Sequence, residues 1–389
     1  MDFFLDYAYD SINKKNEELC GDNVEIIENE DNTIIILADG LGSGVKANIL
    51  ATMTTKIAGT MLKGGASIYE TIETIASTLP VCSVRKLAYS TFAILKISKT
   101  GKAHIVEYDN PPIFFIRNGR LVELSKKERV IHDKKIIESE TQLKKGDTLI
   151  LVSDGAIHAG VGGVLNLGWK WENVAEYVIK QSKIEKCAKV ISKRLIDTSN
   201  FLYNQEPGDD TSAVVIKMRQ PEILQVFSGP PKNKKDDCEL VQKFLQSKGK
   251  KIVCGGTAAN IISRETGEKI NVDFKTGTED VPPIAKIEGL DLVTEGVLTL
   301  TKVLSNMEEY LVDTHLKESA WNLKSKDGAS LLTKIFIEDC THVNFYVGQA
   351  INPAHQNPDL PNLGIKIQVI KNIVKQLESM GKKVSIEYY

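Results

Sequence analysis

The stretch Thr33–Gly44, which reads TIIILADGLGSG, decides the fold of the first half of this 389-residue chain. Its apolar run Ile34–Leu37 predicts a strand that is buried on both faces. A polar, turn-like segment over Asn29–Asn32 separates this strand from another predicted strand, Glu25–Glu28. The apolar run ends just before Asp39, which is followed by a glycine-rich segment and then by a helical pattern. The stretch therefore predicts a carboxylate at the point where a buried strand gives way to a helix.

The segment after Gly44 has the spacing of an amphipathic helix over about residues 44–62. Hydrophobic residues recur at every fourth position, with two more beside them: Val45, Ile49, Met53 and Ile57, with Leu50 and Met61. A helix of this kind normally packs its apolar face against a core. The spacing therefore predicts a core helix directly after Asp39.

Further strand and helix patterns extend over the first 220 residues. Strands are predicted at Ser90–Ile97, Ala103–Tyr108, Ile113–Arg117, Arg120–Leu124, Asp147–Ser153 and Thr211–Met218. Helices are predicted at Ser67–Leu79 and, as a pair, over Trp171–Tyr203. The dipeptide Asn118-Gly119 predicts a tight hairpin. Strands gathered in the middle, with helices before and after them, indicate a layered α+β fold rather than a regular βαβ repeat.

The pattern changes near Pro221, just after the last of these strands. Strands are predicted at Ile223–Phe227, Lys251–Cys254, Leu290–Thr294, Thr341–Val347 and Val384–Tyr388. Helices are predicted at Asp236–Ser247, from Thr257 onward, at Gly296–Leu304 and at Ile365–Leu377. This alternation is typical of an α/β domain. Because 389 residues exceed the size of one typical core, we expect two domains, residues 1–220 and residues 221–389.

The composition restricts the kind of protein. Its 49 Lys and Arg residues nearly balance 51 Asp and Glu residues, so no nucleic-acid-binding surface is expected. No apolar run approaches the roughly 18 residues that span a bilayer. The segment Met1–Asp10 lacks the basic residues of a secretory signal, and the six cysteines form no CxxC pair. These features predict a cytoplasmic protein with reduced thiols and with no membrane or nucleic-acid partner.

Acidic residues beside glycine recur at the ends of predicted strands. They are Asp22 after Gly21, Asp39 before Gly40, Asp154 before Gly155, and Asp209 with Asp210 after Gly208. Short carboxylates aimed from strand ends suit a hard dication such as Mg²⁺ or Mn²⁺, which prefers oxygen ligands in octahedral geometry. A single Asp-Gly is usually a structural turn. Several copies, each at the mouth of a buried strand, favour a metal site.

The order of these motifs resembles the PPM (protein phosphatase 2C) family, and more closely its SpoIIE-like bacterial branch. The residues that carry the resemblance are Gly21-Asp22, Ala38-Asp39-Gly40-Leu41-Gly42-Ser43-Gly44, Ser153-Asp154-Gly155 and Asp209-Asp210-Thr211-Ser212, within about residues 15–218. The resemblance implies a PPM-type layered β-sandwich flanked by helices, which a smaller α/β domain follows here. It also implies hydrolysis of phosphoserine or phosphothreonine on a bacterial signalling protein by a metal-activated water.

The resemblance implies a role for each aspartate by position. Asp39 corresponds to a carboxylate that bridges two ions, Mn²⁺ or Mg²⁺, with the Gly40 carbonyl as a further ligand. Asp154 and Asp209 correspond to other ligands of one ion, and Asp210 adjoins the last of these. Asp22 corresponds to the residue that holds a metal-bound water. The expected metal site comprises Asp22, Asp39, Gly40, Asp154, Asp209 and Asp210, with Asp22 and Asp39 as its catalytic residues.

Some features depart from the family or leave alternatives open. Residues 1–30 contain no arginine to grip the phosphate, so phosphate binding would rest on the ions. His158 is interpreted as a surface histidine, with a general-acid role as the alternative. The family implies that the helices at about residues 44–62 and 171–183 act as a switch, against their interpretation as ordinary core helices.

The resemblance also bears on partners. A phosphorylated signalling protein, such as an anti-sigma-factor antagonist, is the implied substrate, and a homodimer is left open. The rival hypothesis is a signalling module that keeps the fold and binds a partner or metal without turnover.

In the second half, Val253–Asn260 predicts a strand, a glycine pair and the start of a helix. Free backbone N–H groups at such a helix start can hold an anion, whereas Thr257 could equally be just an N-cap. The Gly-Gly-Thr sequence lacks a complete dinucleotide or Walker pattern. We expect a small-molecule ligand cleft at the strand ends and a ligand-sensing or partner-binding role. An enzymatic activity of its own is the alternative.

Overall fold

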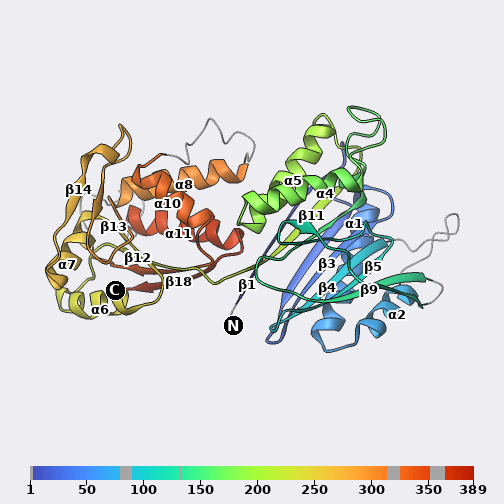
Figure 1. Cartoon of the computed structure of the whole chain (residues 1–389), viewed down its shortest axis with the longest axis horizontal. Coiled ribbons are helices and arrows are strands. Elements are labelled where there is room, and N and C mark those ends of the chain that lie inside the picture. The colour runs from blue at the N-terminus through green and yellow to red at the C-terminus, as the bar shows by residue number, and fades with distance from the viewer. Residues whose placement is uncertain (1–2, 79–89, 132–133, 313–324, 351–363) are drawn as a thin grey trace. The chain divides into compact units, whose positions relative to one another are not determined.

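A computed structural model describes residues 3–78, 90–131, 134–312, 325–350 and 364–389. The chain divides into two compact units, Met1–Gln220 and Pro221–Tyr389. Among the described residues, no helix has the length and apolar character needed to cross a membrane. The first unit has two sheets and the second has one, and each unit has its own helices (Figure 1).

The first unit is built on two antiparallel sheets. One sheet has the order β1-β11-β10-β6-β7, with strands Phe4–Ile12, Thr211–Arg219, Thr148–Val152, Phe114–Arg117 and Arg120–Leu121. The other has the order β2-β3-β4-β5-β9-β8, with strands Asp22–Glu28, Asn32–Gly40, Ser90–Ser98, Lys102–Tyr108, Lys134–Gln142 and Lys126–Ile131. The predicted α+β class, a layered β-sandwich flanked by helices, is confirmed.

The β3 strand shows how the layers pack. Ile35 and Leu37 point into a core that both sheets share, together with Leu151 and Val214 of the facing sheet. The alternate side chains of β3, from Ile34 onward, point to the opposite face and pack under helices. Burial of this strand on both faces is therefore confirmed, and it explains the uninterrupted apolar run.

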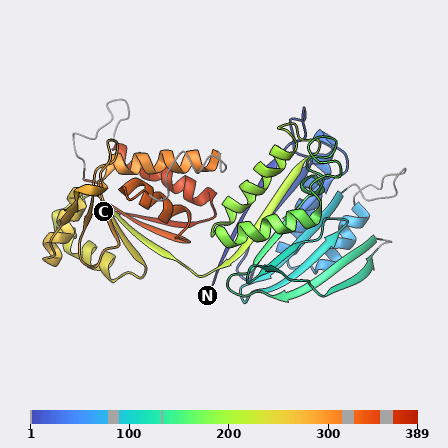
Figure 2. The same ribbon diagram turned by 45° about the horizontal axis from the view of Figure 1, so that its top comes forward.

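Helices cover both outer faces of the sandwich (Figures 1 and 2). Helices α1 (Gly44–Lys63) and α2 (Ile68–Thr78) pack on the β3 sheet. Helices α4 (Trp171–Ile184) and α5 (Ala188–Leu202) pack on the β11 sheet, beside the short helix α3 (Asp154–Ile157).

The prediction of which face of α1 is buried is wrong. Val45, Ile49 and Met53 are 61%, 51% and 40% exposed, respectively. The buried face consists mostly of small residues, such as Ala47 and Ala51. The reason is a very close approach of the helix to the sheet, since most large side chains would not fit between them. The hydrophobic spacing in the sequence identified a helix correctly but assigned the wrong side of it to the core.

Other expectations about the first unit met different outcomes. The Asn118-Gly119 hairpin is confirmed, and both residues have positive φ, 53° and 68°, as a tight turn of this type requires. The strand predicted at Arg120–Leu124 is shorter, since β7 covers Arg120–Leu121. Strands β1, β8 and β9 were not predicted, because charged residues interrupt their apolar patterns.

The first strand is tied to β11 by a buried ion pair. β1 pairs with β11 along its whole length, from Phe4 opposite Arg219 to Ile12 opposite Thr211. The Arg219 guanidinium donates to Asp6 Oδ2 at 3.1 Å, and Asp6 is fully buried. Asp6 Oδ2 also accepts the backbone N–H of Ala188 at 3.2 Å. Asp6 therefore links β1, β11 and the start of α5.

The second unit is a mainly parallel sheet in the order β14-β15-β16-β13-β12-β17-β18. Its strands are Asn271–Asp273, Ile284–Lys286, Leu292–Thr294, Lys250–Cys254, Ile223–Ser228, His342–Val347 and Lys383–Tyr388. Its α-helices are α6 (Asp237–Gln246), α7 (Gly256–Thr266), α8 (Val297–Val312), α10 (Gly328–Ile337) and α11 (Ile365–Ser379). Helices α6 and α7 pack on one face, and α8, α10 and α11 gather on the other (Figure 1). This is the expected α/β architecture; β14, β15 and α10 were not predicted.

Removing the Asp6 carboxylate should strongly destabilise the first unit. Asp6→Ala leaves Arg219 buried without its carboxylate, which typically costs about 3–5 kcal/mol. The matched control is Glu206→Ala, which breaks the exposed ion pair with Lys15 (2.7 Å) and should cost less than about 1 kcal/mol. Urea unfolding measures both free energies. Equal losses in the two variants would contradict the role given to Asp6.

Candidate metal centre

Strand register brings the first two aspartates together. In the antiparallel pair of β2 and β3, Asp22 lies directly opposite Asp39. Side chains directly opposite each other lie on the same face, with Cβ atoms about 4.5–5.5 Å apart. The two carboxylates are therefore neighbours although 17 positions separate them in the sequence.

The other aspartates lie where β10 ends and β11 begins. The Ser153 N–H donates to the Ser212 carbonyl at 3.0 Å, which places Asp154 beside the start of β11. A Cβ on Gly155 would lie 2.1 Å from the Asp210 carbonyl oxygen, so only glycine permits this approach. The Asp154-Gly155 pair therefore packs directly against the backbone of Asp210.

The two groups of aspartates meet at one end of the sandwich. A Cβ on Gly21 would lie 2.7 Å from Asp210 Oδ2, so Asp22 and Asp210 approach each other across the two sheets. Asp39 interacts electrostatically with Asp22, Asp154 and Asp209. The structure thus gathers all five of the aspartates singled out in the sequence.

Only glycine fits at position 40, because the end of β3 is crowded as well. A Cβ at Gly40 would lie 2.0 Å from the Ala47 carbonyl oxygen, so α1 sits directly on the end of β3. The Gly40 N–H donates to the Gly21 carbonyl at 3.1 Å, and the Ser90 hydroxyl donates to the Asp39 carbonyl at 2.9 Å. These contacts hold the Asp39-Gly40 backbone in place. A ligand role for the Gly40 carbonyl stays a prediction.

Burial and crowding shift the pKa values of these carboxyl groups. Burial raises the pKa of Asp39 to about 9, and the charges of Asp22, Asp154 and Asp209 add to the effect. Burial also raises the pKa of Asp22 to about 7, with further contributions from Asp210 and Asp154. Burial followed by the Asp154 charge raises the pKa of Asp209. The site therefore disfavours its own negative charge when no cation is bound.

Several carboxylate oxygens in this cluster are buried without a partner. Both oxygens of Asp22 and Oδ2 of Asp210 make no hydrogen bond. The hydroxyls of Ser153 and Ser212 lie close to Asp22 and lower its pKa. Ser153 Oγ also accepts the Ser212 N–H (2.8 Å), and Ser212 Oγ bonds to Ser11 Oγ (2.7 Å). Buried oxygens that lack partners are the ligands a hard dication prefers. The residues present therefore fit such an ion.

The ligand set is not already assembled. Within the described ranges, no group of three or more His, Cys, Asp or Glu side chains stands ready to hold a metal ion. Clustered like charges without a cation repel one another, which opposes closer approach. The assignment of Asp22, Asp39, Asp154, Asp209 and Asp210 to particular ions therefore stays a prediction.

Lys14 is a neighbour of the aspartate cluster that the sequence did not predict. Its backbone N–H donates to Asp210 Oδ1 at 3.0 Å, and its Nζ lies 4.0 Å from Asp209 Oδ1. Its position, 196 residues before Asp210 in the chain, gave no signal of this contact. His158 is exposed at the C-terminal end of α3, and its backbone N–H donates to the Asp154 carbonyl at 2.9 Å.

Removing one carboxylate should stabilise the metal-free protein. The pKa of Asp39 is raised from 3.8 to about 9 in the folded protein. Between these values the folded protein keeps a proton that the unfolded chain releases, so the free energy of unfolding falls as pH rises. In EDTA, Asp39→Asn should therefore raise the melting temperature by at least about 2 °C at about pH 9, and by less at about pH 5.

Calorimetric melts in EDTA at both pH values measure this difference. The matched control is Asp31→Asn, in an exposed turn outside the cluster, which should leave the melting temperature nearly unchanged. A lower melting temperature for Asp39→Asn at the higher pH would show that the carboxylates do not repel one another.

Several solved structures are similar to this chain over slightly more than half of its length. The PP2C phosphatase domain with a regulatory fragment of SpoIIE from Bacillus subtilis has 20% identity and a TM-score of 0.48, over 56% of this chain and 64% of that one. The RsbU and RsbW domains of a Mycobacterium tuberculosis protein have 15% identity and a TM-score of 0.47, over 62% and 69%. The SiaA-PP2C domain of Pseudomonas aeruginosa has 16% identity and a TM-score of 0.45, over 54% and 85%.

The sequence comparisons are more specific. A search of curated proteins gave no significant match. A family model matches, however, that of stage II sporulation protein E (SpoIIE), over residues 29–219. The matched segment contains β3, β10, β11 and four of the five clustered aspartates, and Asp22 lies just before it. Residues 29–219 of this chain therefore form a domain of the SpoIIE family, of the PPM phosphatase type.

Proposed function

We propose that the first unit is a metal-dependent protein phosphatase that hydrolyses phosphoserine or phosphothreonine on a bacterial signalling protein. The observation that carries this proposal is the cluster of five aspartates at one end of a SpoIIE-family domain, in which Asp22 and Asp210 are buried with unpartnered oxygens. Two Mn²⁺ or Mg²⁺ ions held there would activate a water and neutralise the phosphoryl oxygens.

The proposed ligands come from both sheets. Asp39 lies opposite Asp22 and interacts electrostatically with Asp22, Asp154 and Asp209, which suits a carboxylate shared by two ions. Asp154, Asp209 and the Gly40 carbonyl would complete the set, and Asp210 adjoins it. Asp39 lies at the end of β3, Asp154 begins α3 and Asp209 lies just before β11, so these groups come from neighbouring elements at one end of the sandwich.

Asp22 has a different proposed task. Both of its oxygens are buried and make no hydrogen bond, and an ionised carboxylate only accepts. It would accept hydrogen bonds from a water and orient that water toward the phosphorus. Asp22 faces Asp39 across the strand pair, so the oriented water would lie beside the shared carboxylate.

The proposed substrate is a protein rather than a small phosphate ester. Helix α1 begins four residues after Gly40 and exposes Val45, Ile49 and Met53 along one side. Exposed hydrophobic side chains in a row often mark a protein-contact surface. These side chains support a phosphoprotein partner, and we propose an anti-sigma-factor antagonist in the bacterial cytoplasm. We also propose that a change in the packing of α1 switches activity.

The activity test uses a phosphoserine peptide and p-nitrophenyl phosphate with Mn²⁺. We expect metal-dependent turnover by the wild type, abolished by EDTA, and a loss of at least about 100-fold in Asp39→Asn and in Asp154→Asn, because each would remove an ion ligand. Asp31→Asn should retain wild-type activity.

The same assay separates the two candidate classes. Turnover that survives EDTA or Asp39→Asn would rule out the proposed mechanism. Absence of turnover, together with saturable Mn²⁺ binding in calorimetry, would favour the non-catalytic signalling module.

We also propose that the second unit regulates the first. The division at Gln220 and Pro221 supports this role, because a unit with its own core can change state without unfolding its neighbour. A chain that ends at Gln220 should therefore turn over the phosphopeptide at least about threefold faster or slower than the full chain. Equal rates at saturating Mn²⁺ would argue against regulation.

A further inference from the structure

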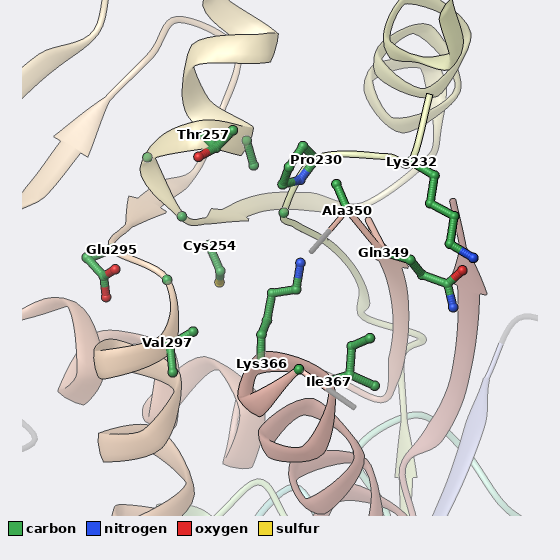
Figure 3. Close-up of a pocket in the computed structure, with 16 residues that line it drawn as sticks. Pro230, Lys232, Cys254, Thr257, Glu295, Val297, Gln349, Ala350, Lys366 and Ile367 are labelled. Carbon is green, nitrogen blue, oxygen red and sulfur yellow. The ribbon is translucent and has the colours of Figure 1, made fainter. Parts of the chain in front are cut away.

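The second unit contains a cavity of about 310 Å³ at the carboxyl ends of its parallel strands. The segments that follow β12, β13, β16 and β17 line it, together with the first turns of helices (Figure 3). A volume near 300 Å³ lies at the lower end of the range of small-molecule sites. The cavity therefore suits a compact ligand rather than a dinucleotide.

The sheet topology places this cavity where ligands bind in such folds. The order β16-β13-β12-β17-β18 has its first strand, β12, in the middle. The chain moves from β12 to β13 on one side, and later continues through β17 and β18 on the other side. Loops at the carboxyl ends diverge at such a reversal and leave a crevice. Pro230, which follows β12, lies at this cavity.

The cavity is electropositive because helix starts and lysines converge on it. The N-termini of α7, α8 and α11 contribute Gly256, Val297 and Ile367 to its wall. Helix N-termini carry a partial positive charge and unpaired N–H donors. Lys366 reaches from α11 toward the middle of the cavity, and Lys232 stands at its rim (Figure 3).

Lys366 is placed to hold an anion rather than an internal carboxylate. Its Nζ donates to the Gly348 carbonyl at 2.6 Å, and an ammonium has three donors. Burial lowers its pKa, which a bound anion would reverse. Glu295 also lines the cavity, but its carboxylate accepts the Leu298 N–H at 3.1 Å and caps its own helix.

A buried hydroxyl beside the residues that line the cavity has no partner. Ser228 ends β12, is fully buried, and its Oγ makes no hydrogen bond. In the parallel register Ser228 lies beside Cys254, which lines the cavity, so the two side chains share one face of the sheet. Gly229, the next residue, also lines the cavity. The Ser228 hydroxyl therefore lies next to two residues of the cavity lining, and its donor and acceptor are unmet.

Gly256 has no structural reason to be glycine. It opens α7, its φ is not left-handed, and a Cβ there would meet no described atom within 4 Å. Alanine would favour the helix by up to about 1 kcal/mol over glycine. A residue without a side chain at this position instead keeps the helix N-terminus open to the cavity.

We propose that this cavity binds a compact small molecule through a phosphate group, held by the α7, α8 and α11 N-termini with Lys366. All these residues belong to the second unit, so the inference stands whether or not the first unit proves to be a phosphatase. The phosphate accepts hydrogen bonds from the helix starts, and the rest of the molecule packs against Pro230, Val297 and Ile367.

The test is calorimetric titration of the full chain in EDTA, which removes phosphate binding through metal ions. The probes are inorganic phosphate, ribose 5-phosphate and AMP, with ribose and adenosine as their unphosphorylated counterparts. We expect saturable binding of at least one phosphorylated probe, at least about tenfold tighter than its counterpart.

Variants locate the binding. Gly256→Asp introduces a negative charge at a helix start that tolerates it, and Lys366→Gln removes the ammonium; each should weaken the phosphorylated probe at least about tenfold. The matched control is Lys250→Gln, an exposed lysine at the opposite end of β13, which should bind as the wild type does. Circular dichroism checks that each variant folds.

Three results would overturn the proposal. One is that no phosphorylated probe binds to the wild type below about 10 mM. Another is equal affinity for a phosphorylated probe and its counterpart. The third is unchanged affinity in both Gly256→Asp and Lys366→Gln.

Discussion

Mutual repulsion among buried aspartates is the constraint on which the first unit depends. Asp22 and Asp39 face each other because of strand register, and a slip of one residue would turn one of them to the other face of the sheet. The β-sandwich core, to which β3 contributes Ile35 and Leu37, holds this strand in place against the repulsion. Stability elsewhere thus maintains an arrangement that is locally unfavourable until a cation compensates it.

The sequence predicts most of the first unit because its strongest signals are local. The apolar run Ile34–Leu37 and the Asn118-Gly119 turn depend on neighbouring residues, and both are confirmed. Asp6 and Lys14 are different, because their partners lie about 200 residues away. Such contacts leave no local pattern. The aspartates were found because each has a glycine close by in the sequence, although the contact that excludes a side chain at Gly21 and at Gly155 is with the distant residue Asp210.

The sequence predicts the fold class of the second unit but not the arrangement of its cavity. Alternating strands and helices indicated an α/β domain, and the glycine pair after β13 indicated one helix start at the strand ends. The convergence of three helix starts depends on strand order, which a single sequence does not reveal. Ser228 illustrates the difference, since its hydroxyl is notable only because folding buries it without a partner.

The small-residue face of α1 has a consequence for experiments that map function by truncating side chains. Ala47, Ala51 and Ala58, which hold this helix against the sheet, are already alanine. An alanine scan would therefore leave these three contacts untested, and would change the middle of the buried face only at Thr54, Thr55 and Gly59. Enlarging side chains, rather than shortening them, is the informative direction here, because most added atoms would have to displace the helix from β3.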